Sequence, residues 1–201
     1  MKILLLAPQP FFIERGTPIA VKCLVEILSR RDWDVDLLAF HEGAGLHYPR
    51  INIVRTPDLK WIRNIPPGLS LKKLVCDIFF FFKAVGLVRR NRYNYIHAVE
   101  ESVFMAILLK MLFRIPFVYD MDSSMSEQIA DSHKALRFLL PAMRWLESIA
   151  LRRATVVLPV CDALDEIARK GGAVKTVILR DPPAFSVAAS TTCATLTWRF
   201  R

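Results

Sequence analysis

The sequence predicts a doubly wound α/β fold with a mostly parallel sheet, Rossmann-like in its organisation. Short runs rich in Val and Ile alternate with longer amphipathic segments, which is the pattern of repeated β–α–β units. Two of these runs, residues 2–7 and 154–160, are almost entirely apolar, as expected of strands covered by helices on both faces. The expected strands are residues 3–7, 35–40, 51–55, 95–99, 117–120, 155–160 and 175–179.

Amphipathic helices are expected between most of these strands. Thr17 is a suitable N-cap for the first helix, and Pro18 suits its first position. Ser70 caps the second helix, in which apolar residues recur at helical spacing and form one apolar face. The four consecutive phenylalanines at 79–82 extend around the helix beyond this face. The expected helices are residues 18–30, 71–91, 101–113, 135–153 and a last one from 161–162 to the glycines at 171–172.

The composition excludes several classes of protein. Of the 201 residues, 53% are hydrophobic and 23% are charged, so a disordered chain is excluded. The mean hydropathy of +0.31 is high for a formal net charge of +9, which predicts apolar surface that meets a partner, a membrane face or a second domain. The most apolar window, residues 74–88, is interrupted by Asp77 and Lys83 and is too short to span a bilayer.

The cysteines and the two ends of the chain give further expectations. The four cysteines form no C-x-x-C pair and have no histidine at metal-ligand spacing, so we expect neither a disulfide framework nor a metal site. A reducing, cytoplasmic location follows, and no export signal is visible. Residues 1–183 form one domain, and residues 184–201, rich in Ser, Thr and Ala, are expected to be a tail or a truncated linker.

Ligands of a doubly wound sheet bind beyond the carboxyl ends of its strands. After the first strand, Arg15, Gly16 and Thr17 stand beside a helix N-terminus, which suits an oxygen-rich or anionic ligand. The segment matches neither G-x-G-x-x-G nor G-x-x-x-x-G-K-[ST], so the main sequence evidence for a dinucleotide-binding site or a P-loop is missing. The alternative is that Gly16 only turns the chain and Thr17 only caps the helix.

Two further loops carry acids and hydroxyl groups at the same predicted edge. Carboxylates and hydroxyls hydrogen-bond sugar hydroxyls, and a carboxylate can stabilise positive charge that develops on a sugar ring. The alternatives are that the serines cap the next helix and that the histidine is a buried structural residue. The candidates after the fourth and fifth strands are His97, Glu100, Asp120, Asp122, Ser123 and Ser124.

Basic residues are dispersed along the chain and form no nucleic-acid-binding motif. Several of them flank the phenylalanine-rich helix at residues 71–91, where they could rest against the anionic inner face of a membrane. The alternative is a solvated helix face whose extra phenylalanines pack under a neighbouring segment.

The order of several motifs resembles the N-terminal domain of family 4 glycosyltransferases, retaining enzymes of the GT-B fold. The motifs are residues 2–8, Arg-Gly-Thr-Pro at 15–18, His-Ala-Val-Glu at 97–100, residues 116–124 and Leu-Arg-Arg-Ala at 151–154. The resemblance covers about residues 1–183. It implies one half of a GT-B architecture, in which the N-terminal domain holds the acceptor and a second Rossmann-like domain holds the nucleotide sugar.

The resemblance also implies an activity and site residues. It implies transfer of a sugar from a nucleotide-sugar donor to a saccharide or lipid-linked acceptor, such as a cell-envelope polysaccharide, without a metal or cofactor. Many relatives have His at the position matched by Asp122. The implied catalytic residues are Asp122 and Glu100, and the implied substrate-binding residues are Arg15, Gly16, Thr17, His97, Asp120, Ser123 and Ser124.

The donor half of the implied enzyme has no counterpart in this sequence. The family's donor domain carries two glutamates eight positions apart and should begin near Pro182, but no such pair occurs in the chain. We therefore expect the chain alone to be inactive. One alternative is a non-catalytic subunit that docks on a separate donor-binding chain, and another is an unrelated α/β module that binds a small nucleotide.

Overall fold

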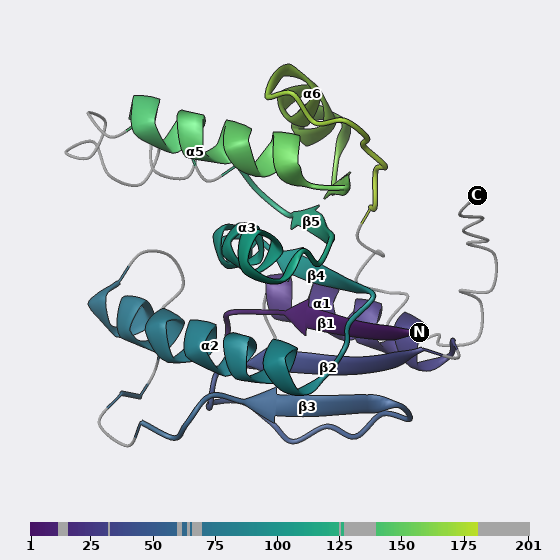
Figure 1. Ribbon diagram of the computed structural model, residues 1–201, viewed down its shortest axis with the longest axis vertical. Helices are drawn as coiled ribbons and strands as arrows, with labels where there is room; N and C mark the ends of the chain where they lie inside the picture. The colour runs from purple at the N-terminus through teal and green to yellow at the C-terminus, as the bar shows by residue number, and fades with distance from the viewer. Residues whose placement is uncertain are drawn as a thin grey trace.

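The computed structural model describes residues 1–11, 16–31, 33–59, 62–63, 65, 70–124, 126 and 140–180 (Figure 1). Within these residues the chain forms one six-stranded sheet in the order β3-β2-β1-β4-β5-β6, and every pair of neighbours is parallel. The doubly wound α/β prediction is thereby confirmed. The strands are β1 (Lys2–Leu6), β2 (Asp34–Ala39), β3 (Ile51–Arg55), β4 (Tyr95–Val99), β5 (Phe117–Met121) and β6 (Val156–Pro159).

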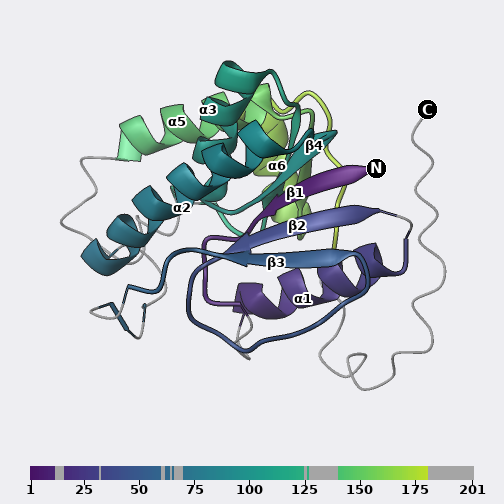
Figure 2. The same ribbon diagram turned by 60° about the horizontal axis from the view of Figure 1, so that its bottom comes forward.

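Helices cover both faces of the sheet. The helix α1 lies on one face, whereas α2, α3 and α5 lie on the other (Figure 2). The strand order reverses between β1 and β4, so the loops after these two strands meet at the carboxyl edge of the sheet. The helices are α1 (Gly16–Ser29), α2 (Leu71–Arg90), α3 (Ser102–Phe113), α5 (Leu140–Arg153) and α6 (Asp162–Lys170).

Three segments differ from the expectation or extend beyond the described residues. The helix α1 begins at Gly16, two residues earlier than predicted, which places Thr17 in its first turn. Residues 175–179 run beside β6, and the amide of Val177 donates to the carbonyl of Val157 over 3.0 Å, but only Thr176 forms a bridge. That segment is therefore not a seventh strand. The expected helix at 135–153 is described only from Leu140 onward.

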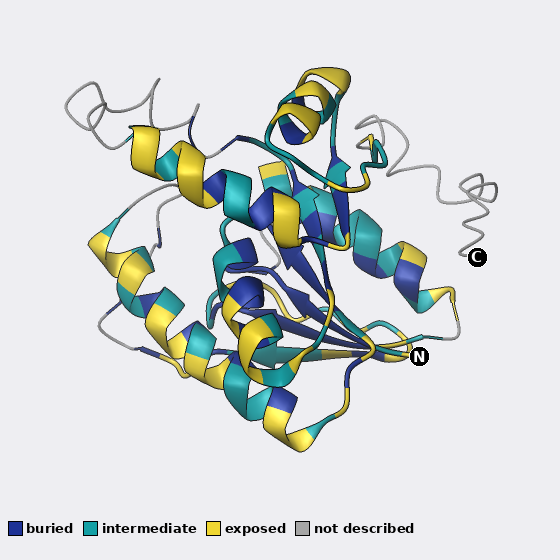
Figure 3. Cartoon of the chain, turned by 45° about the horizontal axis from the view of Figure 1, so that its top comes forward, coloured by how far each residue is buried: buried dark blue, intermediate teal, exposed yellow. Residues whose placement is uncertain are grey.

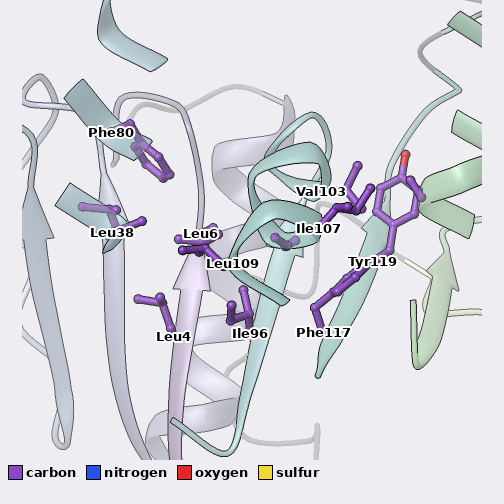
Figure 4. Close-up of a cluster of buried hydrophobic side chains, with 14 of the residues drawn as sticks. Leu4, Leu6, Leu38, Phe80, Ile96, Val103, Ile107, Leu109, Phe117 and Tyr119 are labelled. Atoms are coloured by element: carbon purple, nitrogen blue, oxygen red, sulfur yellow. The ribbon is translucent and has the colours of Figure 1, made fainter. Parts of the chain in front are cut away.

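The core consists of two apolar clusters, one on each face of the sheet. Successive side chains of a strand point to opposite faces, so Leu4 and Leu6 enter one cluster while Ile3 and Leu5 enter the other, all fully buried. Figure 4 shows the first cluster, in which side chains from the sheet pack against α2 and α3. Burial on both faces explains why the β1 sequence is a continuous apolar run.

The loops after β1 and β2 are held in place by Arg55 at the end of β3. Its guanidinium donates to the carbonyl oxygens of Phe11, Glu42 and Ala44, each at 2.6 Å, and to that of Phe40 at 3.2 Å. A planar group with several fixed donors suits this arrangement. Hydrogen bonds from Arg55 therefore connect the backbone of these loops at the carboxyl edge of the sheet, on the β2–β3 side.

Among the residues that the structure describes, no helix is both long enough and apolar enough to cross a bilayer.

Candidate functional site

The first two candidate residues meet at the carboxyl edge of the sheet. Thr17 lies in the first turn of α1, and Glu100 directly follows β4. The Oγ1 of Thr17 donates a hydrogen bond to the Oε1 of Glu100 over 3.2 Å, although the two residues are 83 positions apart. Gly16, exposed and at φ 35°, opens the helix beside them. Arg15 lies outside the described residues.

Glu100 has an unusual backbone conformation. Its φ of 49° is in the left-handed region, which a residue with a side chain adopts at a cost of about 1–3 kcal/mol. Its amide donates to the carbonyl of Asp120 over 3.0 Å, and its carbonyl accepts from the amide of Val103 over 3.2 Å. Strained backbone of this kind concentrates at functional sites, so the conformation singles out Glu100 from the other acids of the edge.

The electrostatic surroundings of Glu100 favour its protonated form. Burial raises the pKa of its carboxyl group, and the nearby Asp120 acts in the same direction. The hydroxyl of Thr17 and the ammonium of Lys73 lower the pKa but do not cancel the effect of burial. A carboxylate with a raised pKa is a stronger base than one in water, so Glu100 can accept a proton or a hydrogen bond from a ligand hydroxyl.

Lys73 and Glu101 complete this cluster, although neither is a candidate residue of the sequence analysis. The ammonium of Lys73 on α2 forms an ion pair with Glu101 and lies 3.9 Å from the Oδ2 of Asp77. Only 12% of the Lys73 side chain is exposed. The hydroxyl of Ser70 accepts from the amide of Lys73 over 3.1 Å, which confirms the predicted cap of this helix. Because Lys73 and Glu101 are 28 residues apart, no spacing rule connects them.

Asp77 provides a prediction about pH. Burial raises the pKa of Asp77 to about 6, and Lys73 opposes this only in part. A raised folded-state pKa means that the unfavourable contribution of ionised Asp77 is absent below about pH 4 and complete above about pH 6. We expect Asp77→Asn to match the wild type near pH 4 and to exceed its free energy of unfolding by about 3 kcal/mol at pH 7.5.

Urea unfolding of both proteins across this range measures the difference. The control is Asp165→Asn on α6, because the nearby hydroxyl of Thr176 and the hydrogen bond from Arg169 lower the pKa of Asp165. Its substitution should therefore have the opposite pH dependence, with a deficit relative to the wild type that shrinks as the pH falls. A difference between Asp77→Asn and the wild type that does not change with pH would show that Asp77 ionises normally.

His97 and Asp120 are also brought together, from the neighbouring strands β4 and β5. The Nε2 of His97 lies 2.9 Å from the Oδ2 of Asp120. His97 is only 5% exposed, so most of its surface is withdrawn from solvent. In this arrangement the imidazole can orient the Asp120 carboxylate, which is close to Glu100 through the backbone contact described above.

The loop after β5 contains half-buried and buried candidates. Asp122 and Ser123 are half-buried, whereas Ser124 is buried. The hydroxyls of Ser124 and Ser126 donate to the Oε2 of Glu147 over 3.2 and 2.8 Å. Glu147 is a buried residue of α5 that the sequence analysis did not single out. The hydrogen bond from Ser124 to Glu147 therefore holds the loop against α5.

The edge as a whole presents carboxylates and hydroxyls without a metal centre. Among the described residues, no group of three or more His, Cys, Asp or Glu side chains could hold a metal ion. The groups that do converge, Thr17, Glu100 and Asp120, accept or donate hydrogen bonds. Such a set suits a ligand with many hydroxyl groups.

Comparison with protein families gives a match over most of the chain. The model of a family described as a glycosyl transferase 4-like domain matches residues 15–181. No curated protein sequence matches the chain.

Solved structures share the fold at low sequence identity. Sucrose-phosphate synthase from Thermosynechococcus elongatus has a TM-score of 0.68 at 19% identity, over 90% of this chain and 48% of that one. A second structure of this synthase gives 0.65 at 17% identity, over 94% and 93% of the two chains. Arabidopsis thaliana UGT89C1 complexed with UDP has a TM-score of 0.52 at 14% identity, over 94% of this chain and 56% of that one. The chain thus spans about half of the first synthase structure.

Proposed function

Because the chain belongs to the family of glycosyl transferase 4-like domains, we propose that it forms the acceptor-side half of a nucleotide-sugar-dependent glycosyltransferase. The acceptor is a saccharide or a lipid-linked saccharide, such as a precursor of a cell-envelope polysaccharide. The observation that carries this proposal is the contact between Thr17 and Glu100 at the carboxyl edge. It combines a hydroxyl and a raised-pKa carboxylate at the place where a doubly wound sheet binds its ligands.

The candidate residues described at the carboxyl edge have distinct roles in this proposal. Glu100 accepts a hydrogen bond from the acceptor hydroxyl, and Thr17 holds the Glu100 carboxylate in place. Asp122 and Ser123 contact the transferred sugar from the loop after β5. His97 orients Asp120, which lies near Glu100 at the same edge of the sheet. Positioning of the acceptor carries most of the catalysis in this scheme, with no protein nucleophile.

Arg15 and Gly16 have a different assignment in this proposal, which is contact with the donor. Gly16 at the N-terminus of α1 is placed to approach a donor phosphate, because helix N-termini favour anions. The arginine that precedes it would add a positive charge.

The donor site itself belongs, in this proposal, to a second domain or to a separate chain. The absence of two glutamates eight positions apart supports this assignment. The structural relative UGT89C1 was solved with UDP, which supports a nucleotide-sugar donor. Among the described residues, Cys23, Cys76 and Cys161 are thiols rather than disulfides, which supports a reducing, cytoplasmic location.

A capture experiment tests the acceptor-side assignment. The purified chain is passed over immobilised saccharides and polyprenyl-linked saccharides, and the retained protein is measured. We expect retention by at least one acceptor class and about a tenfold loss of retention in Glu100→Gln, because one charge-assisted hydrogen bond is weakened. The control Arg169→Gln on the exposed side of α6 should be retained like the wild type. Equal retention of both variants would refute the assignment of Glu100.

A second experiment decides where the donor site lies. Co-purification of the chain with a nucleotide-sugar-binding protein would establish the two-chain arrangement, in which this protein is the acceptor subunit.

A further inference from the structure

We propose that the outer face formed by α2, α3 and α5, here called the helix face, rests on the surface of a membrane that contains anionic lipids. The three helices lie together on one side of the sheet (Figures 1 and 2). Their outward surfaces are largely exposed, most visibly along α2 and α5 (Figure 3). The proposal concerns a partner of the protein and stands independently of the sugar-transfer reaction.

Large apolar side chains are exposed on the helix face. On α2, residues Leu71, Ile78 and Phe82 follow one another at helical spacing, and Leu71 and Phe82 are 82% and 67% exposed. The buried stripe of this helix, which includes Phe80 and Ala84, lies on its other side. The exposed set across the three helices is Leu71, Leu74, Ile78, Phe79, Phe82, Leu108, Met111, Leu112, Trp145 and Leu146. Apolar surface of this extent marks an interaction site.

The charges of the three helices are strongly unbalanced. Their sequences contain nine Lys or Arg residues and only two acids, Asp77 and Glu147. Glu147 is buried, and Asp77 lies beside the Lys73 ammonium. The neighbouring α6 is different, with three acids and two basic residues. The positive charge is therefore a property of this face, and its natural complement is an anionic surface.

The combination of the two features favours lipid over an acidic protein. Basic residues such as Lys72, Lys83 and Arg89 stand next to exposed Leu and Phe on the same helix. A bilayer interface offers both partners at once, because phosphates accept the charges while the acyl boundary takes the apolar side chains. The exposed Trp145 of α5 is also a side chain that prefers this interface.

The helix face lies close to the candidate site, so contact of this face with a membrane would determine where the site lies. Leu71 begins α2 only two residues before Lys73, which pairs with Glu101 at the carboxyl edge. A protein resting on this face would therefore hold the site close to the lipid surface, where a lipid-linked acceptor is found. This role rests on the proposed function, whereas the membrane contact does not.

Sedimentation with vesicles tests the proposal. The purified chain is mixed with vesicles of phosphatidylcholine alone or with added phosphatidylglycerol, at low and high salt. We expect binding only with the anionic lipid and a strong reduction at high salt. Lys83→Gln combined with Arg89→Gln should lower the partition coefficient about 25-fold, since each basic residue contributes about a fivefold gain.

The apolar part is tested by Leu71→Ser combined with Phe82→Ser, which should lower the partition coefficient at least about tenfold. Matched controls are Val174→Ser and Lys175→Gln, two exposed positions outside the three helices, which should bind like the wild type. Circular dichroism checks that each variant is folded, as expected for substitutions of exposed residues.

Several outcomes would overturn the proposal. They are a wild type that fails to bind anionic vesicles, equal binding to neutral vesicles, or helix-face variants that bind like the controls. Self-association without lipid that is lost in the Leu71 and Phe82 double variant would assign the face to a second copy of the chain instead. The test uses no sugar, so its failure leaves the proposed function untouched, and the converse also holds.

Discussion

Replacing Lys73 by Met should lower the free energy of unfolding by about 3 kcal/mol. The side chain of Lys73 is 12% exposed, and its ammonium pairs with Glu101 and Asp77, whose side chains are 25% and 20% exposed. Removal of one partner from such a group leaves carboxylates in a poorly solvated place, and this is more costly than the loss of a surface ion pair. Urea unfolding at pH 8 measures the change.

A matched control lies on the same helix. Lys83 is exposed, so Lys83→Met should change the stability by less than about 0.5 kcal/mol. The double variant Lys73→Met, Asp77→Asn should recover part of the loss, because one of the two uncompensated acids is then neutral. Equal effects at the two lysines would mean that the cluster around Lys73 contributes nothing to stability.

Glycine at position 100 should make the protein more stable and remove its acceptor binding. Glu100 has a φ of 49°, which Gly adopts without strain, and burial raises the pKa of the carboxyl that would be removed. Glu100→Gly should therefore raise the free energy of unfolding by about 1 kcal/mol at pH 7.5. Retention on the saccharides that capture the wild type should fall at least about tenfold.

Arg114 offers a control with the same backbone geometry. It ends α3 with a φ of 59° and is exposed. Arg114→Gly should give a similar gain in stability, because Gly is favoured at a left-handed helix end. It should leave saccharide retention unchanged. A Glu100→Gly protein that is less stable than the wild type, or that still binds acceptor, would show that the strain at Glu100 serves no ligand.

The fold could be predicted from the sequence because its signals are local. Apolar runs such as residues 2–7 identify buried parallel strands, and Ser70 identifies the start of α2. The placement of Thr17 and Glu100 at the same edge followed from a topological rule, since both come after strands of a parallel sheet. Their contact also depends on the pairing of β1 with β4, which only the structure shows. The same reasoning did not fix the first residue of α1, because Gly16 and Thr17 both fit near a helix N-terminus.

The remaining parts of the site depend on contacts between distant side chains. Glu147 reads as an ordinary helix residue, and only the packing of α5 shows that it holds Ser124 and Ser126. Arg55 reads as the polar end of a strand, although its guanidinium fixes the backbone of two loops. The left-handed φ of Glu100 also has no sequence signal, because Gly is the residue usually expected there.

A calorimetric titration of the purified chain with UDP-glucose, GDP-mannose and ADP-glucose tests the central claim most directly. If the chain is the acceptor-side half of the enzyme, none of the three should bind with a dissociation constant below about 1 mM. Binding of any one of them with a dissociation constant near about 1 μM would show that this domain builds a donor site by itself, and would contradict the acceptor-side assignment.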